Sequence, residues 1–476
     1  MALDSWPFAV LTAVGLILFY VSRNSLWRKG VLIGLSGAFI SSFIPHWKMG
    51  LGLIGYGLAV IVAGYWQARR PGSVLLAASL AVLTLGFLWL KGYLALLTPS
   101  LPISGMVAVG ISYILFRAIQ ILCDLNDGTL ELHDLTLPDL VLHLFLFLTF
   151  PAGPIARYED SKAQFDALGG IRLEAIDLNG SIFRISLGYA KIVALAPWLL
   201  SLHADLATSA PGNVVSLASA ALVFLAYVYA NFSGYMDIIV GIGALFGLSI
   251  PENFDKPYLA TSFLDLWNRW HITLSRTFQT YVFYPLVRLL SRARGRSLVP
   301  GLISYLVVFF LLGFWHGATP AFAIFGLMLG LGAAGCKLLE YAWNAASGNR
   351  FVEYARSSNI WAMTARAFAI AWFAISSIAI WPSVTTIGDL KAAVAASAPW
   401  HVAAALLLAT LLVATVDTIF RLVAVVVQLL PKPRASGHSG LGTPGPAIIG
   451  LLVVIAFTAA ILAPKEFNTL VLYQRY

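Results

Sequence analysis

The stretch "SLVPGLISYLVVFFLLGFWHGATP" (residues 297–320) joins a long apolar run to an ionisable side chain. Between Leu298 and Leu312 only Ser304 and Tyr305 carry polar groups. A run of about 17 to 25 apolar residues is long enough to cross a bilayer as a helix. The run ends at His316, so we expect a membrane-spanning helix that carries an imidazole at its C-terminal end.

The whole chain has the composition of an integral membrane protein. It has 476 residues, of which 59% are hydrophobic and 11% charged, and its mean hydropathy is +0.85. Soluble domains carry roughly a quarter charged residues. We therefore predict one all-α polytopic membrane domain over residues 1–476, with about 11–13 transmembrane helices and additional re-entrant or interfacial helices.

The expected spans follow the apolar runs. Residues 8–22 are expected to be a retained first span, because "MALDSWPFAV" lacks the positively charged start of a signal peptide. Residues 431–445, rich in Pro, Gly and Ser, form a predicted linker. The predicted spans are 8–22, 31–45, 50–66, 73–90, 103–123, 181–202, 214–232, 234–250, 298–315, 319–343, 360–382, 401–430 and 446–463.

Basic residues give the expected topology. The net charge is +9, and many of the cations cluster just outside apolar runs, which the positive-inside rule places in the cytoplasm. On this basis the N-terminus is extracytoplasmic, and no nucleic-acid partner is expected. The clusters are Arg23, Arg28 and Lys29; Arg69 and Arg70; Arg288, Arg292, Arg294 and Arg296; and Lys432 and Arg434.

Two regions do not fit simple spans. In 139–160, "DLVLHLFLFLTFPAGPIARYED", prolines and glycine interrupt an apolar helix, which is tolerated at membrane depth only where protein or a water-filled cavity covers the backbone. The second region is 251–296. Its large apolar side chains from Phe263 to Tyr281 recur at spacings of three and four, which predicts one face of an interfacial or cavity-lining helix.

The motifs that mark metal and hydrolase sites are missing from the sequence. Cys123 and Cys336 form no CxxC pair, so neither a disulfide nor a metal site is predicted. There is no GxSxG, HExxH or nucleotide-binding signature.

Trp-His occurs three times, at 270–271, 315–316 and 400–401. An ionisable group in an apolar segment is costly and favours a function, and neutral imidazole suits a general base. A structural histidine is the alternative reading.

Several stretches together resemble the bacterial membrane-bound O-acyltransferases. These are "GISYILFRAIQILCDLNDGTL" (110–130), "FPAGPIARY" (150–158), "NFSGYMDIIVGIGALFGLSIPENFDKPY" (231–258), "SFLDLWNRWHITLSRTFQTYVFYPL" (262–286) and "GFWHGATPAFAIFG" (313–326). The resemblance covers about residues 100–345, flanked by spans in 1–99 and 346–476. It implies a ring of helices around a central funnel and tunnel in a bacterial inner membrane.

The resemblance also implies roles for particular residues. His316 matches the catalytic histidine of the "WHG" motif, and His271 matches the second histidine, in "RWH". The expected substrate and donor surface around them comprises Asn268, Arg269, Trp267, Trp270, Trp315, Arg276 and Asp237. No permanently bound cofactor is expected, and no metal.

The expected reaction is transfer of an acyl group across the membrane. The donor would be a cytoplasmic phosphopantetheine thioester, either acetyl-CoA or an acyl carrier protein, and the acceptor a hydroxyl of an extracytoplasmic glycan or relay partner. The motifs resemble both D-alanyl transferases of teichoic acids and polysaccharide acetylases of the alginate type, so acetyl and D-alanyl remain open.

Two other functions are compatible with many spans. A secondary transporter or flippase would also have a broken helix and buried polar residues, with Asp237 as its main carboxylate. A non-catalytic subunit that recruits a carrier protein would keep the fold without the base.

Overall fold

The computed structural model describes residue 3 and residues 5–44, 46–93, 110–208, 214–294, 297–346 and 358–381. These residues are predominantly helical, and one isolated β-bridge joins Phe254 to Trp270. The helices are α1 (Trp6–Val21), α2 (Ser25–Ser41), α3 (Trp47–Arg69), α4 (Ser73–Leu90), α5 (Ile111–Asn126), α6 (Leu137–Phe145), α7 (Tyr158–Asp166), α8 (Leu178–Tyr189), α9 (Ala196–Thr208), α10 (Val214–Leu245), α11 (Phe263–Arg269), α12 (Ile272–Phe278), α13 (Tyr284–Arg294), α14 (Val299–His316), α15 (Pro320–Ala345) and α17 (Asn359–Ser377).

Within the described residues, seven helical segments are long and apolar enough to cross a membrane. They are α3, α4, the continuous α8–α9 segment, α10, α14, α15 and α17. The prediction of an all-α polytopic membrane protein is confirmed. One shorter apolar helix, α1, contains 16 residues.

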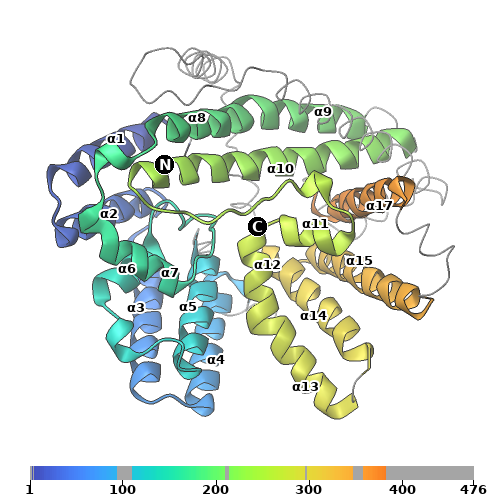
Figure 1. Cartoon of the computed structure of the whole chain (residues 1–476), viewed down its shortest axis with the longest axis horizontal. Helices are drawn as coiled ribbons and strands as arrows, with labels where there is room; N and C mark the ends of the chain where they lie inside the picture. The colour runs from blue at the N-terminus through green and yellow to red at the C-terminus, as the bar shows by residue number, and fades with distance from the viewer. Residues whose placement is uncertain are drawn as a thin grey trace.

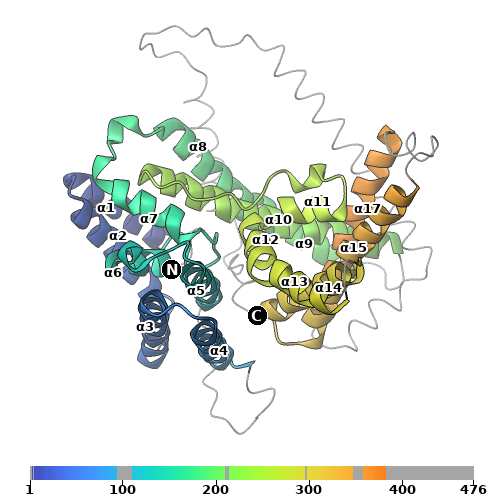
Figure 2. The same ribbon diagram turned by 60° about the horizontal axis from the view of Figure 1, so that its bottom comes forward.

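The helices form two groups joined by long helices. In Figure 1, α8, α9 and α10 run along the upper edge, with α1 to α7 on the left and α11 to α17 on the right. Figure 2 shows the same separation from another side. Helix α5 bridges the groups, because the Phe116 ring lies 5.5 Å from the rings of both Phe278 and Trp315.

The predicted spans 214–232 and 234–250 are wrong as separate elements. The structure has one helix, α10, of 32 residues. Gly234, inside this helix, permits a close contact with α8. A Cβ atom there would lie 2.9 Å from the carbonyl oxygen of Gly188 on α8.

Some predicted elements lie outside the described residues. These are the spans 401–430 and 446–463, the linker 431–445 and the first part of the span 103–123, of which α5 describes residues from Ile111.

The predicted interruption within 139–160 is confirmed. Helix α6 ends at Phe145, and the next helix, α7, begins at Tyr158. The side chain that satisfies this irregular backbone is Arg117 of α5, which is 1% exposed. Its guanidinium donates to the carbonyl groups of His143 (2.7 Å), Leu144 (2.8 Å) and Thr149 (2.8 Å).

Two of the cations assigned to a cytoplasmic loop have structural partners. The buried Arg28 guanidinium donates to the carbonyls of Leu168 (2.6 Å) and Ile171 (2.9 Å). Lys29 forms an ion pair with buried Asp139 at 2.6 Å. Both therefore stabilise the packing of α2 against α6 and the segment after α7.

Replacing Arg117 by Met should destabilise the protein by about 3 kcal/mol or more, because several buried carbonyls would lose a charged donor. Thermal unfolding in detergent measures the effect, and Arg288→Met, at an exposed position, is the matched control. An Arg117→Met protein as stable as the control would show that these hydrogen bonds contribute little.

Candidate active site

His316 is the last residue of α14 and is placed by a close contact between two helices. Gly313, one turn earlier, packs against Gly326 of α15 so tightly that a Cβ on Gly313 would lie 2.8 Å from the Gly326 Cα. The partly buried His316 ring has the Trp315 ring centroid at 4.4 Å and the Phe325 centroid at 6.2 Å. The "WHGATP" stretch is thus a tight turn between two packed helices.

His271 occupies a break in the helix predicted from the aromatic spacing. That single helical face over 263–281 is wrong, because α11 ends at Arg269, α12 starts at Ile272, and π-helical geometry follows from Gln279. His271 itself has φ 47° and ψ 51°, a left-handed conformation that costs a non-glycine residue on the order of 1 kcal/mol or more. A periodic pattern cannot reveal such a break.

A short antiparallel pairing holds this break on both sides of His271. The Asp255 N–H donates to the Arg269 carbonyl (3.0 Å), and the Ile272 N–H donates to the Asn253 carbonyl (3.0 Å). The imidazole is 3% exposed and lies 4.8 Å from the Phe232 ring. Neither of its ring nitrogens has a hydrogen-bond partner among the described residues.

His316 acts electrostatically on His271. Burial lowers the pKa of His271 to about 3, and the nearby His316 ring adds to the decrease. Burial disfavours the charged form of an imidazole, so His271 is neutral at pH 7. A neutral ring offers one acceptor nitrogen and one N–H donor.

The three predicted tryptophans are buried among aromatic rings. Trp267 lies 4.7 Å from Phe309 of α14, and Trp270 lies 5.0 Å from Phe373 of α17. The Trp315 indole N–H is buried without a hydrogen-bond partner in the described part of the chain. The Trp315 ring also lies 4.4 Å from the His316 ring.

The polar residues beside His271 differ in their availability. Arg269 is occupied, because its guanidinium donates to Asp265 at 2.8 Å and to Asp255 at 3.3 Å. The exposed Asn268 accepts a hydrogen bond from Gln279 at 3.1 Å. Arg276 is exposed, so it has the freer approach to a ligand.

Asp237 belongs to a separate ionic cluster on α10. Its carboxylate accepts from Lys191 at 2.6 Å and from Arg184 at 3.2 Å, and Arg184 also pairs with Glu252 at 2.6 Å. A carboxylate with two cationic partners is compensated within the protein. Its contacts are those of a structural ion pair between α8 and α10.

Comparison with known proteins identifies the family of this chain. The sequence profile of the membrane-bound O-acyltransferase family matches residues 47–380, about two thirds of the chain. This chain belongs to the membrane-bound O-acyltransferase family. It is therefore an acyltransferase, and the matched region contains both histidines.

Three relatives illustrate the range of the family. The chain is 27% identical over 353 residues to the teichoic acid D-alanyltransferase of Bacillus subtilis, covering 67% of this chain and 86% of the relative. It is 35% identical over 202 residues to the peptidoglycan O-acetyltransferase of Helicobacter pylori, with 40% and 36% covered. It is 27% identical over 332 residues to a probable alginate O-acetylase of Azotobacter vinelandii, with 65% and 63% covered.

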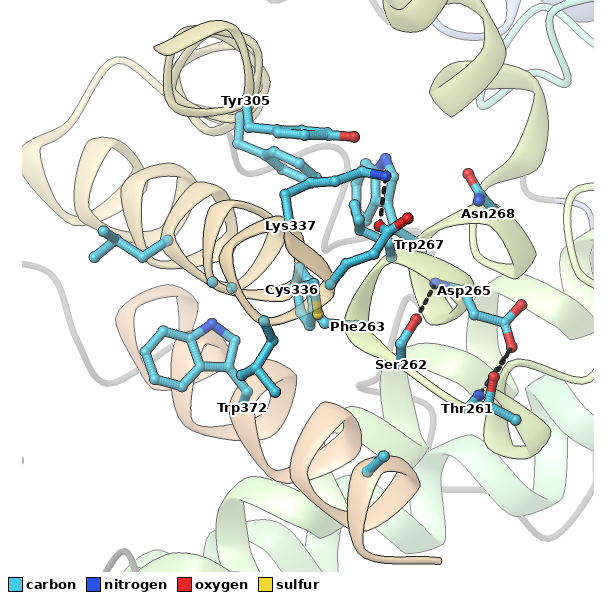
Figure 3. Close-up of a pocket in the computed structure, with 18 of the residues that line it drawn as sticks. Thr261, Ser262, Phe263, Asp265, Trp267, Asn268, Tyr305, Cys336, Lys337 and Trp372 are labelled. Carbon is cyan, nitrogen blue, oxygen red and sulfur yellow. Dashed lines mark hydrogen bonds and ion pairs between the residues drawn. The ribbon is translucent and has the colours of Figure 1, made fainter. Parts of the chain in front are cut away.

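A cavity of about 960 Å³ borders the candidate site of this acyltransferase. Figure 3 shows it between α11, which contributes Trp267 and Asn268, and the transmembrane helices that contribute Tyr305, Lys337 and Trp372. Neither histidine belongs to its wall. Two of the predicted binding residues, Trp267 and Asn268, thus line this cavity, and the two histidines do not.

A polar cluster around Asp124, at the end of α5, is absent from the residues predicted from the sequence. The largely buried carboxylate accepts from the Tyr281 hydroxyl at 2.9 Å and pairs with Arg157 at 3.3 Å. Asp124 lies in the quoted "ILCDLNDG", where a carboxylate directly after an apolar run was the available signal. The cluster ties the end of α5 to the π-helical segment after α12 and to the start of α7.

Lowering the pH should destabilise the protein through His271. Its folded-state pKa, about 3, lies below the value of about 6.5 for an unfolded histidine. The contribution of His271 to the free energy of unfolding is therefore complete above pH 6.5 and is lost as the pH falls toward 3. At pH 5 the loss is about 2 kcal/mol. Melting in detergent from pH 7.5 to 5 measures this for the wild type and His271→Gln. Equal pH slopes in the two proteins would show that His271 does not titrate as described.

Proposed function

We propose that this acyltransferase moves an acetyl or D-alanyl group from a cytoplasmic thioester to a hydroxyl of an extracytoplasmic polysaccharide or relay protein. The observation that carries the proposal is the pair of neighbouring histidines in a largely apolar interior. Buried polar atoms in proteins nearly always have partners. Those of His271 and Trp315 lack one among the described residues, which suits groups that contact a substrate.

His316 is proposed as the general base. A neutral ring nitrogen accepts the hydroxyl proton while the hydroxyl oxygen attacks the thioester carbon. A C–O bond forms, the C–S bond breaks, and the leaving thiolate takes the proton back from the imidazolium. The products are an ester and a free thiol, and the base is regenerated.

His271 is proposed to orient or polarise a reactant beside His316. Because His271 is neutral at pH 7 and buried against Phe232, it can donate one hydrogen bond without bringing a second charge into the site. A donated hydrogen bond would stabilise negative charge on the carbonyl oxygen in the transition state.

The proposed orientation of the protein in the membrane rests on the arginine-rich helix ends and turns. The α3–α4 turn, with Arg69 and Arg70, and the end of α13 both lie at the lower edge of Figure 1. This edge is the proposed cytoplasmic face, from which the thioester would enter in the inner membrane of a bacterium. Arg276, which is exposed, is the proposed contact for anionic groups of the donor.

The acceptor class follows the relatives' names, which refer to teichoic acid, peptidoglycan and alginate. A cell-surface glycan is therefore the proposed acceptor. The transport alternative loses its main support, because Asp237 is held by two cations.

Substituting His316 by alanine removes the proposed base, so the rate of ester incorporation should fall at least about 100-fold. The protein should still fold. Mass spectrometry of alkali-labile esters on surface polymers measures the product at matched membrane abundance. His133→Ala, in a side chain that is 75% exposed, is the control. Incorporation by His316→Ala at the control level would exclude His316 as the base.

Replacing Asp237 by Asn should lower the melting temperature, because Lys191 and Arg184 lose a buried counter-charge. Ester incorporation per folded molecule should stay within about threefold of the wild type, since the cluster is structural. A folded Asp237→Asn protein with no activity would assign Asp237 to the transfer path instead.

A further inference from the structure

Asn253 is the buried side chain that organises the backbone around His271. It is 0% exposed and lies in the segment between α10 and α11, eighteen residues before His271. Its backbone carbonyl accepts the Ile272 N–H at 3.0 Å. Its side-chain oxygen accepts twice from Thr273, from the backbone N–H at 3.1 Å and from the hydroxyl at 2.6 Å.

Thr273 extends this contact to the interrupted segment between α6 and α7. The Ile155 N–H donates to the Thr273 hydroxyl oxygen at 3.0 Å, so one hydroxyl both donates to Asn253 and accepts from Ile155. Thr273 is 5% exposed. Ile155 follows the stretch that Arg117 holds, because the Arg117 guanidinium also reaches the Pro154 carbonyl at 3.4 Å.

From this geometry we infer that Asn253 and Thr273 are positioning residues for His271. Together they join the segment before α11, the His271 break and the loop that contains Ile155. His271 has a left-handed backbone and no hydrogen bond of its own ring to another described residue. Its position therefore depends on the backbone on either side and on packing against Phe232. The backbone before His271 is held by the Asp255–Arg269 hydrogen bond, and the backbone after it by Asn253 together with Thr273.

The inference rests on the proposed function of His271, and it adds residues to which no role is otherwise assigned. Removing the Thr273 hydroxyl would leave the Ile155 N–H without its acceptor and Asn253 with one donor fewer. The His271 ring would then shift relative to His316. A displacement of about 1 Å at a reacting centre can cost on the order of 100-fold in rate.

The test compares four variants. Thr273→Val removes the hydroxyl and keeps the shape, Thr273→Ala removes it without the branched side chain, and Thr273→Ser restores it. Thr277→Val is the matched control, because the buried Thr277 hydroxyl donates only to the Thr273 carbonyl, at 2.8 Å. Initial rates of ester incorporation into surface polymers are measured at matched membrane abundance, with melting temperatures in detergent.

Thr273→Val and Thr273→Ala should lower the rate about 10- to 100-fold, with Thr273→Ser and Thr277→Val within about threefold of the wild type. Hydrogen exchange at the Ile155 amide should accelerate in the Val and Ala variants only. Melting temperatures close to that of Thr277→Val would show that the loss is one of positioning.

Two results would overturn the inference. In the first, Thr273→Val is fully active while His271→Ala and His316→Ala are inactive, in which case the proposed function stands and the positioning role falls. In the second, both hydroxyl-free variants fail to fold, which makes Thr273 a requirement of the fold. Full activity of His271→Ala and His316→Ala would instead reject the proposed function itself.

Discussion

The hydrogen bonds of Arg117 and Asn253 to irregular backbone are the interactions on which the rest of this structure depends. A membrane offers no water to a backbone group that leaves a helix, so each such group needs a partner within the protein. Arg117 supplies donors to buried carbonyls at the end of α6 and in the segment that follows it. Asn253 supplies acceptors to the amides at the His271 break. The two irregular segments then meet directly, through Ile155 and Thr273.

The two histidines reach the same region by different means. His316 is the last residue of a regular helix, and the glycine contact between α14 and α15 fixes the position of that helix end. His271 lies in a break between two helices, and the paired backbone segments around the break hold it in place. A rigid helix end and a clamped turn are both suited to holding reactive groups to within fractions of an ångström.

Part of this arrangement could be predicted from the sequence and part could not. Long apolar runs gave the positions of α3, α4, α14 and α15, because a membrane span depends on length and composition alone. Periodicity failed at residues 263–281, since spacing does not record a single residue with positive φ. The boundary predicted between the spans 214–232 and 234–250 falls inside α10, where Gly234 allows a close contact with α8.

Charged residues were the least predictable elements. Arg28 belongs to a basic cluster beside an apolar run but is buried against carbonyls of a segment some 140 residues later. Arg269 resembled an anion contact but is held by two carboxylates. The carbonyls that Arg117 contacts lie 26 to 32 residues later in the chain, and no sequence pattern indicates that they are its partners.

The proposed acyl transfer from a thioester explains why the site, among the described residues, has two histidines and no charged triad. A thioester is already activated, so the transfer needs one base and one hydrogen-bond donor rather than a charged relay. A buried carboxylate beside the histidines would carry a large desolvation cost in an apolar interior. The buried carboxylates of the described region accordingly have cationic partners: Asp124 pairs with Arg157, Asp139 with Lys29, and Asp237 with Lys191 and Arg184. The low pKa of His271 belongs to the same pattern, because a group that must stay uncharged is best placed where burial disfavours its protonated form.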